Sequence, residues 1–392
     1  MRYGVGMRII QRYLATNFVG PFVLGSLFFI IFLLTFQLFN LVKVILNKDV
    51  PFLEVLTLLA NISISFTPLS IPISILFATM FTLSKLAEDS EIVAMRAFGF
   101  SKTKIFFPFL LMGVLIGLAL YSLNLKIIPN SKTQFKNTVI KLTSKAILRN
   151  VKSSQFYAEI PKATIYAEKV SKRGTLLEDV FIHIRNEEGV DERSILAKKG
   201  VLIKSQEGSE RSPKMRLLLY DGNIAKINRG KKDVEKVLFK EYEFPIMSGD
   251  IKIGFVTRDG MRSNEEIVEL RKKIKEEIKG LVPGETKGEG LERLKKRLLN
   301  LEIEYWQRIN NSVQCVVFVF LAFCLSFGHN RFKKNGFSGP LFLSIIGYYG
   351  LFFFLLSLVK KGEVPAYLAI LSPSALVFLF SIFLMRRLNW VS

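Results

Sequence analysis

Six apolar runs constrain the fold of this chain more than any other feature of its sequence. Each run approaches or exceeds the about 20 residues that a helix needs to cross the hydrocarbon core of a bilayer. Half of the 392 residues are hydrophobic, and 35 of them are phenylalanine. The runs lie at residues 17–46, 52–83, 105–127, 309–328, 338–359 and 364–385. The sequence therefore predicts an α-helical membrane protein with six transmembrane helices.

The polar stretch between the third and fourth runs has a different pattern. It contains short alternating segments separated by turn signals such as Asp221-Gly222. The predicted strands lie at 155–160, 163–167, 179–185, 194–205, 214–220 and 235–246. Short alternating strands at this spacing are typical of an antiparallel sandwich or a barrel-like sheet.

A charged segment follows the predicted strands. Ser263 and Glu266 have the spacing of a capping box, which predicts a helix that runs to about Lys279. A second helix carries leucines at helical spacing and continues into the fourth run.

The chain accordingly divides into four parts. Residues 1–127 hold an N-terminal interfacial helix and three spans, and residues 128–262 form a β domain. Residues 263–305 are a charged helical connector, and residues 306–392 hold the last three spans.

The basic residues of the short loops predict the orientation. If the N-terminus is cytoplasmic, one side of the membrane holds most of these residues, as the positive-inside rule requires. These are Arg2, Arg8, Arg12, Lys85, Arg96, Lys102, Lys104, Arg331, Lys333, Lys334, Arg386 and Arg387. The other side holds Lys43, Lys48, Lys360 and Lys361. Both termini are then cytoplasmic, and the β domain is extracytoplasmic.

The polar stretch Glu88–Ser101 separates the second and third runs. It begins with acidic residues, which suit the positive end of a helix dipole, and reaches Gly99, a residue typical of a left-handed C-cap. Ile92, Met95 and Gly99 share one helical face, and Val93 and Ala97 extend it. The pattern indicates a short amphipathic helix on the cytoplasmic side, and its alternative is a solvated turn with a helical tendency.

Several functions are disfavoured by the sequence. It has no G-x-x-x-x-G-K-[ST] phosphate loop, no H-E-x-x-H motif and no nucleophile elbow. The cysteines, Cys315 and Cys324, lie in one apolar run and suggest neither a disulfide nor a metal site. The runs hold almost no ionisable groups, which argues against a proton-driven carrier or a channel. We expect neither enzymatic activity nor a cofactor, and no nucleic acid as a partner of this basic chain.

The sequence resembles the LptF/LptG permease family along its whole length. The resemblance rests on Leu83–Ser101, on residues 8–21, on Glu304–Arg308 and on the prolines of the sixth run, Pro365 and Pro373. One departure is the pair Asn310-Asn311, which stands where the family often has a proline. Residues 41–46 and 179–185 are more similar to LptF than to its paralogue LptG.

The resemblance implies a function and a set of partners. The family's members are permease subunits of an ABC transporter that extracts lipopolysaccharide from the bacterial inner membrane and passes it to a periplasmic bridge. Their partners are an LptB-type ATPase dimer, the paralogous six-span permease, an LptC-type bitopic subunit and lipopolysaccharide. The resemblance also implies that the β domain is a periplasmic β-jellyroll.

Two sets of site residues follow from the resemblance. The first set would couple the permease to the ATPase and comprises Glu88, Glu91, Ile92, Met95, Arg96, Phe98 and Gly99. The second would contact the lipid and comprises Lys43, Lys48, Phe36, Phe39, Lys360 and Lys361. Lysines at a membrane interface also extend toward water in any membrane protein, and phenylalanines also face lipid. Both alternatives, ordinary interfacial lysines and lipid-facing phenylalanines, stay open.

Two other functions also stay open. The chain is alternatively a membrane-anchored binding or signalling module, although an anchor does not need six spans. A mechanotransmission-type ABC permease is the other alternative. Such permeases usually have four spans, with the outer domain between the first two, so the order of parts in this sequence counts against it.

Overall fold

The computed structural model describes most of the chain, in segments that form two compact units. The described segments are 2–46, 52–150, 153–160, 163–171, 176–185, 191–205, 214–228, 233–247, 257, 259–280, 289–328 and 338–387. The helical unit comprises residues 1–37, 59–132 and 258–392, and the sheet unit comprises residues 38–58 and 133–257.

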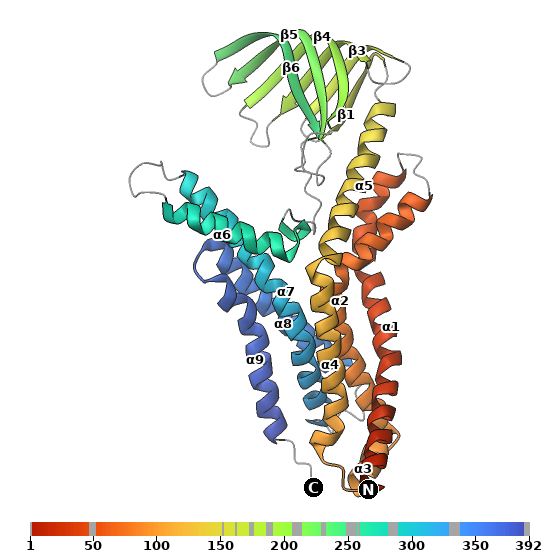
Figure 1. Ribbon diagram of the computed structural model, residues 1–392. Helices are drawn as coiled ribbons and strands as arrows, with labels where there is room; N and C mark the ends of the chain where they lie inside the picture. The colour runs from red at the N-terminus through yellow and green to blue at the C-terminus, as the bar shows by residue number, and fades with distance from the viewer. Residues whose placement is uncertain are drawn as a thin grey trace. The chain divides into compact units, whose positions relative to one another are not determined.

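Six helices in the described residues are long and apolar enough to cross a membrane (Figure 1). They are α1 (Arg2–Leu46), α2 (Phe52–Glu88), α4 (Lys102–Leu125), α7 (Glu289–Gly328), α8 (Ser338–Lys361) and α9 (Ala366–Arg387). The six predicted spans are confirmed. Three of them precede the β domain in the sequence, and three follow it. Two helices are longer than the sequence suggested, because α1 absorbs the predicted interfacial helix and α2 continues through Glu88.

Helix α7 is the centre of the helical unit and packs against both α4 and α9. Two glycines one helical turn apart, Gly113 and Gly117, allow the close approach of α4. A Cβ atom on Gly113 would lie 2.7 Å from Val319 Cγ2, and one on Gly117 would lie 2.8 Å from the Ser312 carbonyl oxygen. Small residues at this spacing let membrane helices pack closely, because the burial of apolar surface does not drive their association in lipid.

Helix α6 (Asn264–Gly280) pairs with the first turns of α7. The predicted cap at Ser263 is present, since its hydroxyl accepts a hydrogen bond of 3.3 Å from the Glu266 amide. Ile267 and Ile274 are buried against Leu301 of α7. On the surface of α6, the hydrogen bond to the Glu269 carboxylate raises the pKa of Lys273.

Arg308 of α7 connects α7 to neighbouring segments of the helical unit. It is 4% exposed, and its guanidinium donates to the Glu304 carboxylate at 3.2 Å and to the Arg262 carbonyl at 2.8 Å. Glu304 also lies 3.9 Å from the Lys132 ammonium. This group, which we call the Arg308 clasp, connects α7 with the 3₁₀ turn η1 (Asp259–Met261) and the start of α5.

The sheet unit contains six antiparallel strands that pair in chain order (Figure 1). They are β1 (Gln155–Ile160), β2 (Ala163–Val170), β3 (Leu176–Arg185), β4 (Asp191–Ser205), β5 (Lys214–Asn228) and β6 (Asp233–Met247). The six predicted strand positions are confirmed, and so is the antiparallel β domain. Helix α5 (Ile127–Asn150) precedes the sheet, and the sequence did not predict it.

The core of the sheet unit lies on one face of the sheet. Ile165, Ile182 and Ile195 are neighbours on consecutive strands and are almost fully buried, and Ile140 of α5 joins the same cluster. Asp179 and Asp221 adopt left-handed backbone angles beside this core. The strand pairing keeps the same register on both sides of these two residues, so neither is an extra residue in its strand.

Candidate functional site

The most specific motif of the sequence forms a short helix, α3 (Glu91–Ala97), at one end of the helical unit. Glu88 ends α2, and Asp89 and Ser90 form the turn into α3, so the acidic residues before Glu91 are not in the first turn of α3. The helix ends in the motif that the sequence predicted. Gly99 has a φ of 79°, its amide donates to Arg96, and the Phe100 amide donates to Met95. These two bonds make a complete Schellman C-cap.

The two faces of α3 have different environments. Ile92 and Met95 are 6% and 8% exposed, and they pack in a cluster with Leu14 of α1. Val93 and Phe98 are 61% and 83% exposed. The predicted amphipathic face is therefore present in part: Ile92 and Met95 hold α3 on the bundle, whereas Val93, which was expected on the same face, is exposed. Exposed apolar side chains on the other face are the ones available to a partner.

Polar contacts connect α3 and its flanks to other helices. The Tyr13 hydroxyl of α1 donates a hydrogen bond of 2.8 Å to the Glu91 carboxylate. Lys102, at the start of α4, donates to the Met385 carbonyl of α9 at 3.1 Å. Figure 1 shows α1 beginning and α9 ending at the end of the unit that carries α3. A force applied to α3 therefore has direct routes into the first and last membrane helices.

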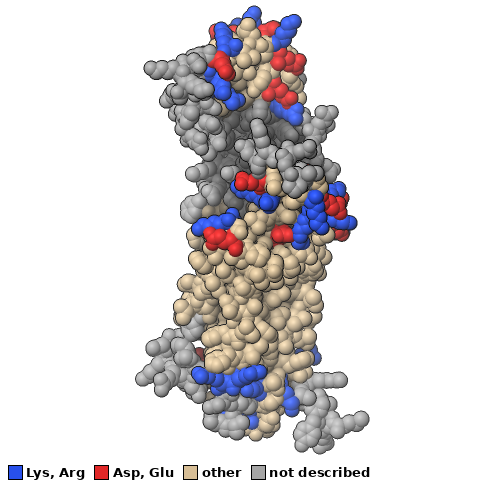
Figure 2. Space-filling view, turned by 90° about the vertical axis from the view of Figure 1, so that its left-hand side faces the viewer, with Lys and Arg blue, Asp and Glu red and all other residues tan. Residues whose placement is uncertain are grey.

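Charge separates the two ends of the helical unit (Figure 2). Basic side chains gather at the end near α3, an uncharged band follows, and side chains of both signs lie at the α6 end. The basic residues near α3 are Lys85, Arg96, Lys102, Lys104, Arg386 and Arg387. An uncharged band between two charged ends is the surface expected of a membrane-spanning bundle.

The residues predicted to contact lipid are only partly described. Phe36 is 63% exposed and packs edge-on against Phe32, which in turn stacks on Phe28. Lys360 and Lys361 are exposed in the last turn of α8.

The other three predicted lipid contacts are harder to place. Lys43 and Phe39 lie in α1, but their side chains are outside the described residues, as is Lys48 altogether. The structure therefore does not bring this set together as a site.

The sequence patterns did not predict two features of the helical unit. Tyr13 falls within residues 8–21, which carry part of the resemblance, but nothing in the sequence shows that its hydroxyl reaches Glu91. The polar residues Gln307, Asn310, Asn311 and Gln314 recur at one face of α7, and this spacing was a visible signal. Among the described residues, no group of three or more His, Cys, Asp or Glu side chains is suited to hold a metal ion.

The fold defines a class: a multi-pass membrane protein with a β domain between its third and fourth spans. The model of the lipopolysaccharide export system permease LptF/LptG family matches residues 12–387. The chain belongs to this family. The match does not separate LptF from LptG, and a search of curated proteins found no match.

Proposed function

We propose that this chain is a permease subunit of an ABC transporter that extracts lipopolysaccharide from the inner membrane and delivers it to a periplasmic bridge. The observation that carries the proposal is α3, a capped helix with an exposed apolar face at the basic end of the bundle. The sequence has no phosphate loop, so the energy of ATP has to enter through another subunit. Helix α3 is the surface suited to receive it.

The two faces of α3 would have different roles in coupling: one would bind the ATPase, and the other would transmit its movement to the bundle. Val93 and Phe98 would insert into a groove of the LptB-type ATPase, with Glu88 and Arg96 making polar contacts at its rim. Ile92 and Met95 would transmit the movement, because they are packed inside the bundle. Gly99 matters because its left-handed backbone closes the helix and returns the chain to α4.

Helices α1 and α8 would face the second permease subunit and the lipid. Their most apolar stretches have 11% and 17% of their residues buried, the lowest values of the six candidate spans. Phe36 on α1 and the lysine pair Lys360-Lys361 on α8 would contact the lipid there, and Lys43, Lys48 and Phe39 stay predictions. The further partners would be the paralogous permease and an LptC-type bitopic subunit. We assign the chain to the LptF branch on residues 41–46 and 179–185.

The proposed topology places α3 and both termini in the cytoplasm and the sheet unit in the periplasm. Both native cysteines are buried, so a cysteine introduced at Val93 would be the accessible one among the described residues. We expect a membrane-impermeant maleimide to label Val93→Cys in inverted membrane vesicles that have been stripped of the ATPase, and to leave it unlabelled in spheroplasts. The reverse pattern would overturn the topology.

The coupling role is tested by purifying the full chain in gentle detergent and measuring the ATPase subunit that accompanies it. Val93→Asp places a charge on the exposed face of α3, and we expect it to lower ATPase recovery by about tenfold or more, as for a central contact of an interface. Val268→Asp is the matched control, since Val268 is 48% exposed on α6. Equal recovery with both variants would rule out docking through α3.

Phosphorylated lipid in the same preparation tests the cargo. Lipopolysaccharide bound to the wild-type complex supports the transport function. A chain that retains the ATPase but carries no such lipid would favour a mechanotransmission-type permease. A chain that is recovered alone would favour a membrane-anchored binding module.

A further inference from the structure

A stripe of amide side chains runs along one face of α7 where its membrane-spanning part begins. Gln307, Asn310, Asn311 and Gln314 recur at the i, i+3, i+4 and i+7 positions, the spacing of a single helical face. The segment Gly290–Phe327 is otherwise apolar enough to cross a bilayer. Polar groups at such a position are costly unless they find hydrogen-bond partners or serve a function.

Packing explains two of the four amides. Asn310 donates to the Tyr348 hydroxyl at 3.0 Å, and Ser374 donates to the Asn310 carbonyl oxygen at 2.7 Å. The Tyr348 hydroxyl and Ser374 Oγ are 2.9 Å apart, which closes a ring of three hydrogen bonds that joins α7, α8 and α9. Gln314 donates to the Tyr349 hydroxyl at 3.0 Å.

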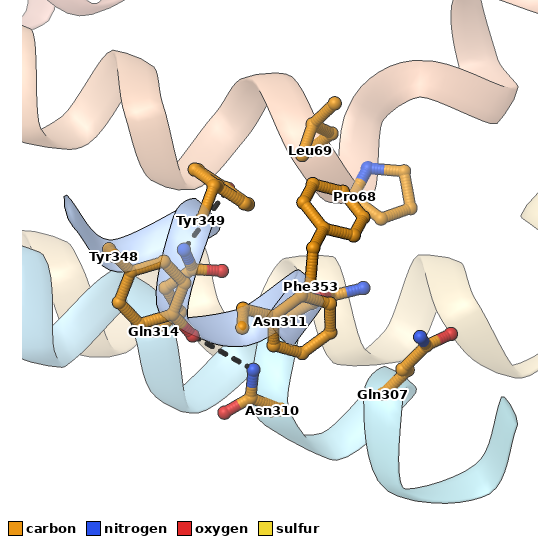
Figure 3. Close-up of a pocket in the computed structure, with 10 residues that line it drawn as sticks. Pro68, Leu69, Gln307, Asn310, Asn311, Gln314, Tyr348, Tyr349 and Phe353 are labelled. Carbon is orange, nitrogen blue, oxygen red and sulfur yellow. Dashed lines mark hydrogen bonds between the residues drawn. The ribbon is translucent and has the colours of Figure 1, made fainter. Parts of the chain in front are cut away.

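The other two amides, Gln307 and Asn311, face a cavity between α2, α7 and α8 (Figure 3). In the part of the chain that the structure describes, neither side chain has a hydrogen-bond partner. The Tyr349 hydroxyl accepts the bond from Gln314 and keeps its own hydrogen to donate. The site thus offers two unused amides and one unused hydroxyl donor.

The remaining walls of the cavity are apolar. Pro68 and Leu69 line it from α2, and Phe352 and Phe353 line it from α8. Its volume is about 160 Å³, roughly ten times what a single water molecule requires. The cavity is therefore large enough for part of an organic ligand.

The chemistry of the lining selects the ligand. None of the lining residues is ionisable at neutral pH, so a phosphate or a carboxylate would lose its hydration without gaining a counter-charge. Primary amides both donate and accept, so they match a ligand group that does the same. An ester carbonyl only accepts. The apolar walls suit a hydrocarbon chain on either side of that group.

We propose that this cavity binds the acyl chain of a membrane lipid at a point where the chain carries an amide or a hydroxyl group. Gln307 and Asn311 hydrogen-bond to that group, and Pro68, Leu69 and Phe353 enclose the neighbouring methylenes. The site lies within one subunit and selects an uncharged part of the lipid. It stands apart from the docking of an ATPase on α3.

Two photoreactive probes test the proposal on the full chain in lipid nanodiscs. They are the N-methyl amide and the methyl ester of one diazirine-bearing fatty acid. We expect the amide to label the α7 and α8 peptides of the wild-type protein about fivefold more than the ester, the difference expected for one neutral hydrogen bond. The double variant Gln307→Leu, Asn311→Leu should remove that difference.

Thr35→Val on α1 is the control, because its hydroxyl bonds only within its own helix, and it should label as wild type. If the double variant does not fold, the single variant Asn311→Leu, which is close to isosteric, removes one amide of the site and should lower the excess of amide over ester labelling. Equal labelling by amide and ester in the wild-type protein would overturn the proposal, as would unchanged labelling in the folded variants. Labelling needs no ATPase, so its failure and a failure of docking at α3 are separate results.

Discussion

Helices α1 and α7 are both membrane-spanning, yet their side chains have opposite environments. The most apolar stretch of α1 has 11% of its residues buried, and its exposed side chains include Leu24, Phe28 and Phe32. The corresponding share in α7 is 56%, and α7 carries amides, a buried arginine and close contacts to two glycines.

The difference follows from the solvent on each side of a membrane helix. A phenylalanine costs nothing in lipid, so α1 can leave its rings exposed until a partner covers them. A buried amide or guanidinium needs hydrogen bonds within the protein, and Arg308, Asn310 and Gln314 of α7 find them where other helices pack. Changes to the contacts that α7 makes should therefore affect stability strongly, and matched changes at exposed positions should affect it weakly.

The Arg308 clasp should give the largest effect. Arg308→Met leaves the Arg262 carbonyl without its donor and Glu304 with only the Lys132 ammonium at 3.9 Å, and we expect a loss of about 3–5 kcal/mol in the free energy of unfolding. Arg297→Met, on an exposed face of the same helix, should change it by less than about 0.5 kcal/mol. Unfolding of the purified chain in detergent measures both. Equal losses in the two variants would mean that the buried clasp does not stabilise the unit.

The glycine contact between α4 and α7 should give the next effect. Gly117→Val forces a side chain against the Ser312 carbonyl and should destabilise the protein by about 1–3 kcal/mol. Gly20→Val makes the same change on α1, where a Cβ meets nothing within 4 Å, and should leave the free energy of unfolding nearly unchanged. If Gly20→Val lowers the free energy of unfolding more than Gly117→Val does, the proposed contrast between α1 and α7 is wrong.

The hydrogen-bonded ring of α7, α8 and α9 should give a smaller effect. Tyr348→Phe removes one hydroxyl from the ring, and hydrogen bonds between membrane helices contribute about 0.6 kcal/mol on average and about 1.7 kcal/mol at most. We expect a loss in that range from the same unfolding measurement. Tyr367→Phe is the control, because Tyr367 is 48% exposed on α9. A loss no larger than that of Tyr367→Phe would show that the ring does not hold the three helices together.

The same contrast explains how far the sequence alone could predict the fold. Long apolar runs and alternating segments are local patterns, so the six spans and all six strand positions could be predicted. The cap at Ser263 and the left-handed Gly99 are local too, and both are present. Helix α5 has no clear amphipathic pattern, and its helical structure depends in part on packing of Ile140 against the sheet.

The candidate site was less predictable, because a pattern identifies a face and does not show what covers it. Ile92 and Met95 share the face that the sequence marked, and tertiary packing turns that face toward the bundle. Asn310-Asn311 stood out only as a departure from the family, although the four amides of α7 share a single face. The hydrogen-bond partners of Asn310 are Tyr348 and Ser374, which are 38 and 64 residues away from it in the chain.

The smallest effect concerns the polar contact between α1 and α3. Tyr13→Phe removes the hydroxyl that bonds to the Glu91 carboxylate. Because Tyr13 is 42% exposed and water screens a charged acceptor at the surface, we expect a loss of only about 0.5 kcal/mol. Hydrogen exchange of the α3 amides should then be roughly twofold faster, whereas Tyr121→Phe on α4 should leave it unchanged. Unchanged exchange in Tyr13→Phe would mean that Ile92 and Met95 alone fix α3. In that case α1 would be connected to α3 only through apolar packing, and its contrast with α7 would be sharper still.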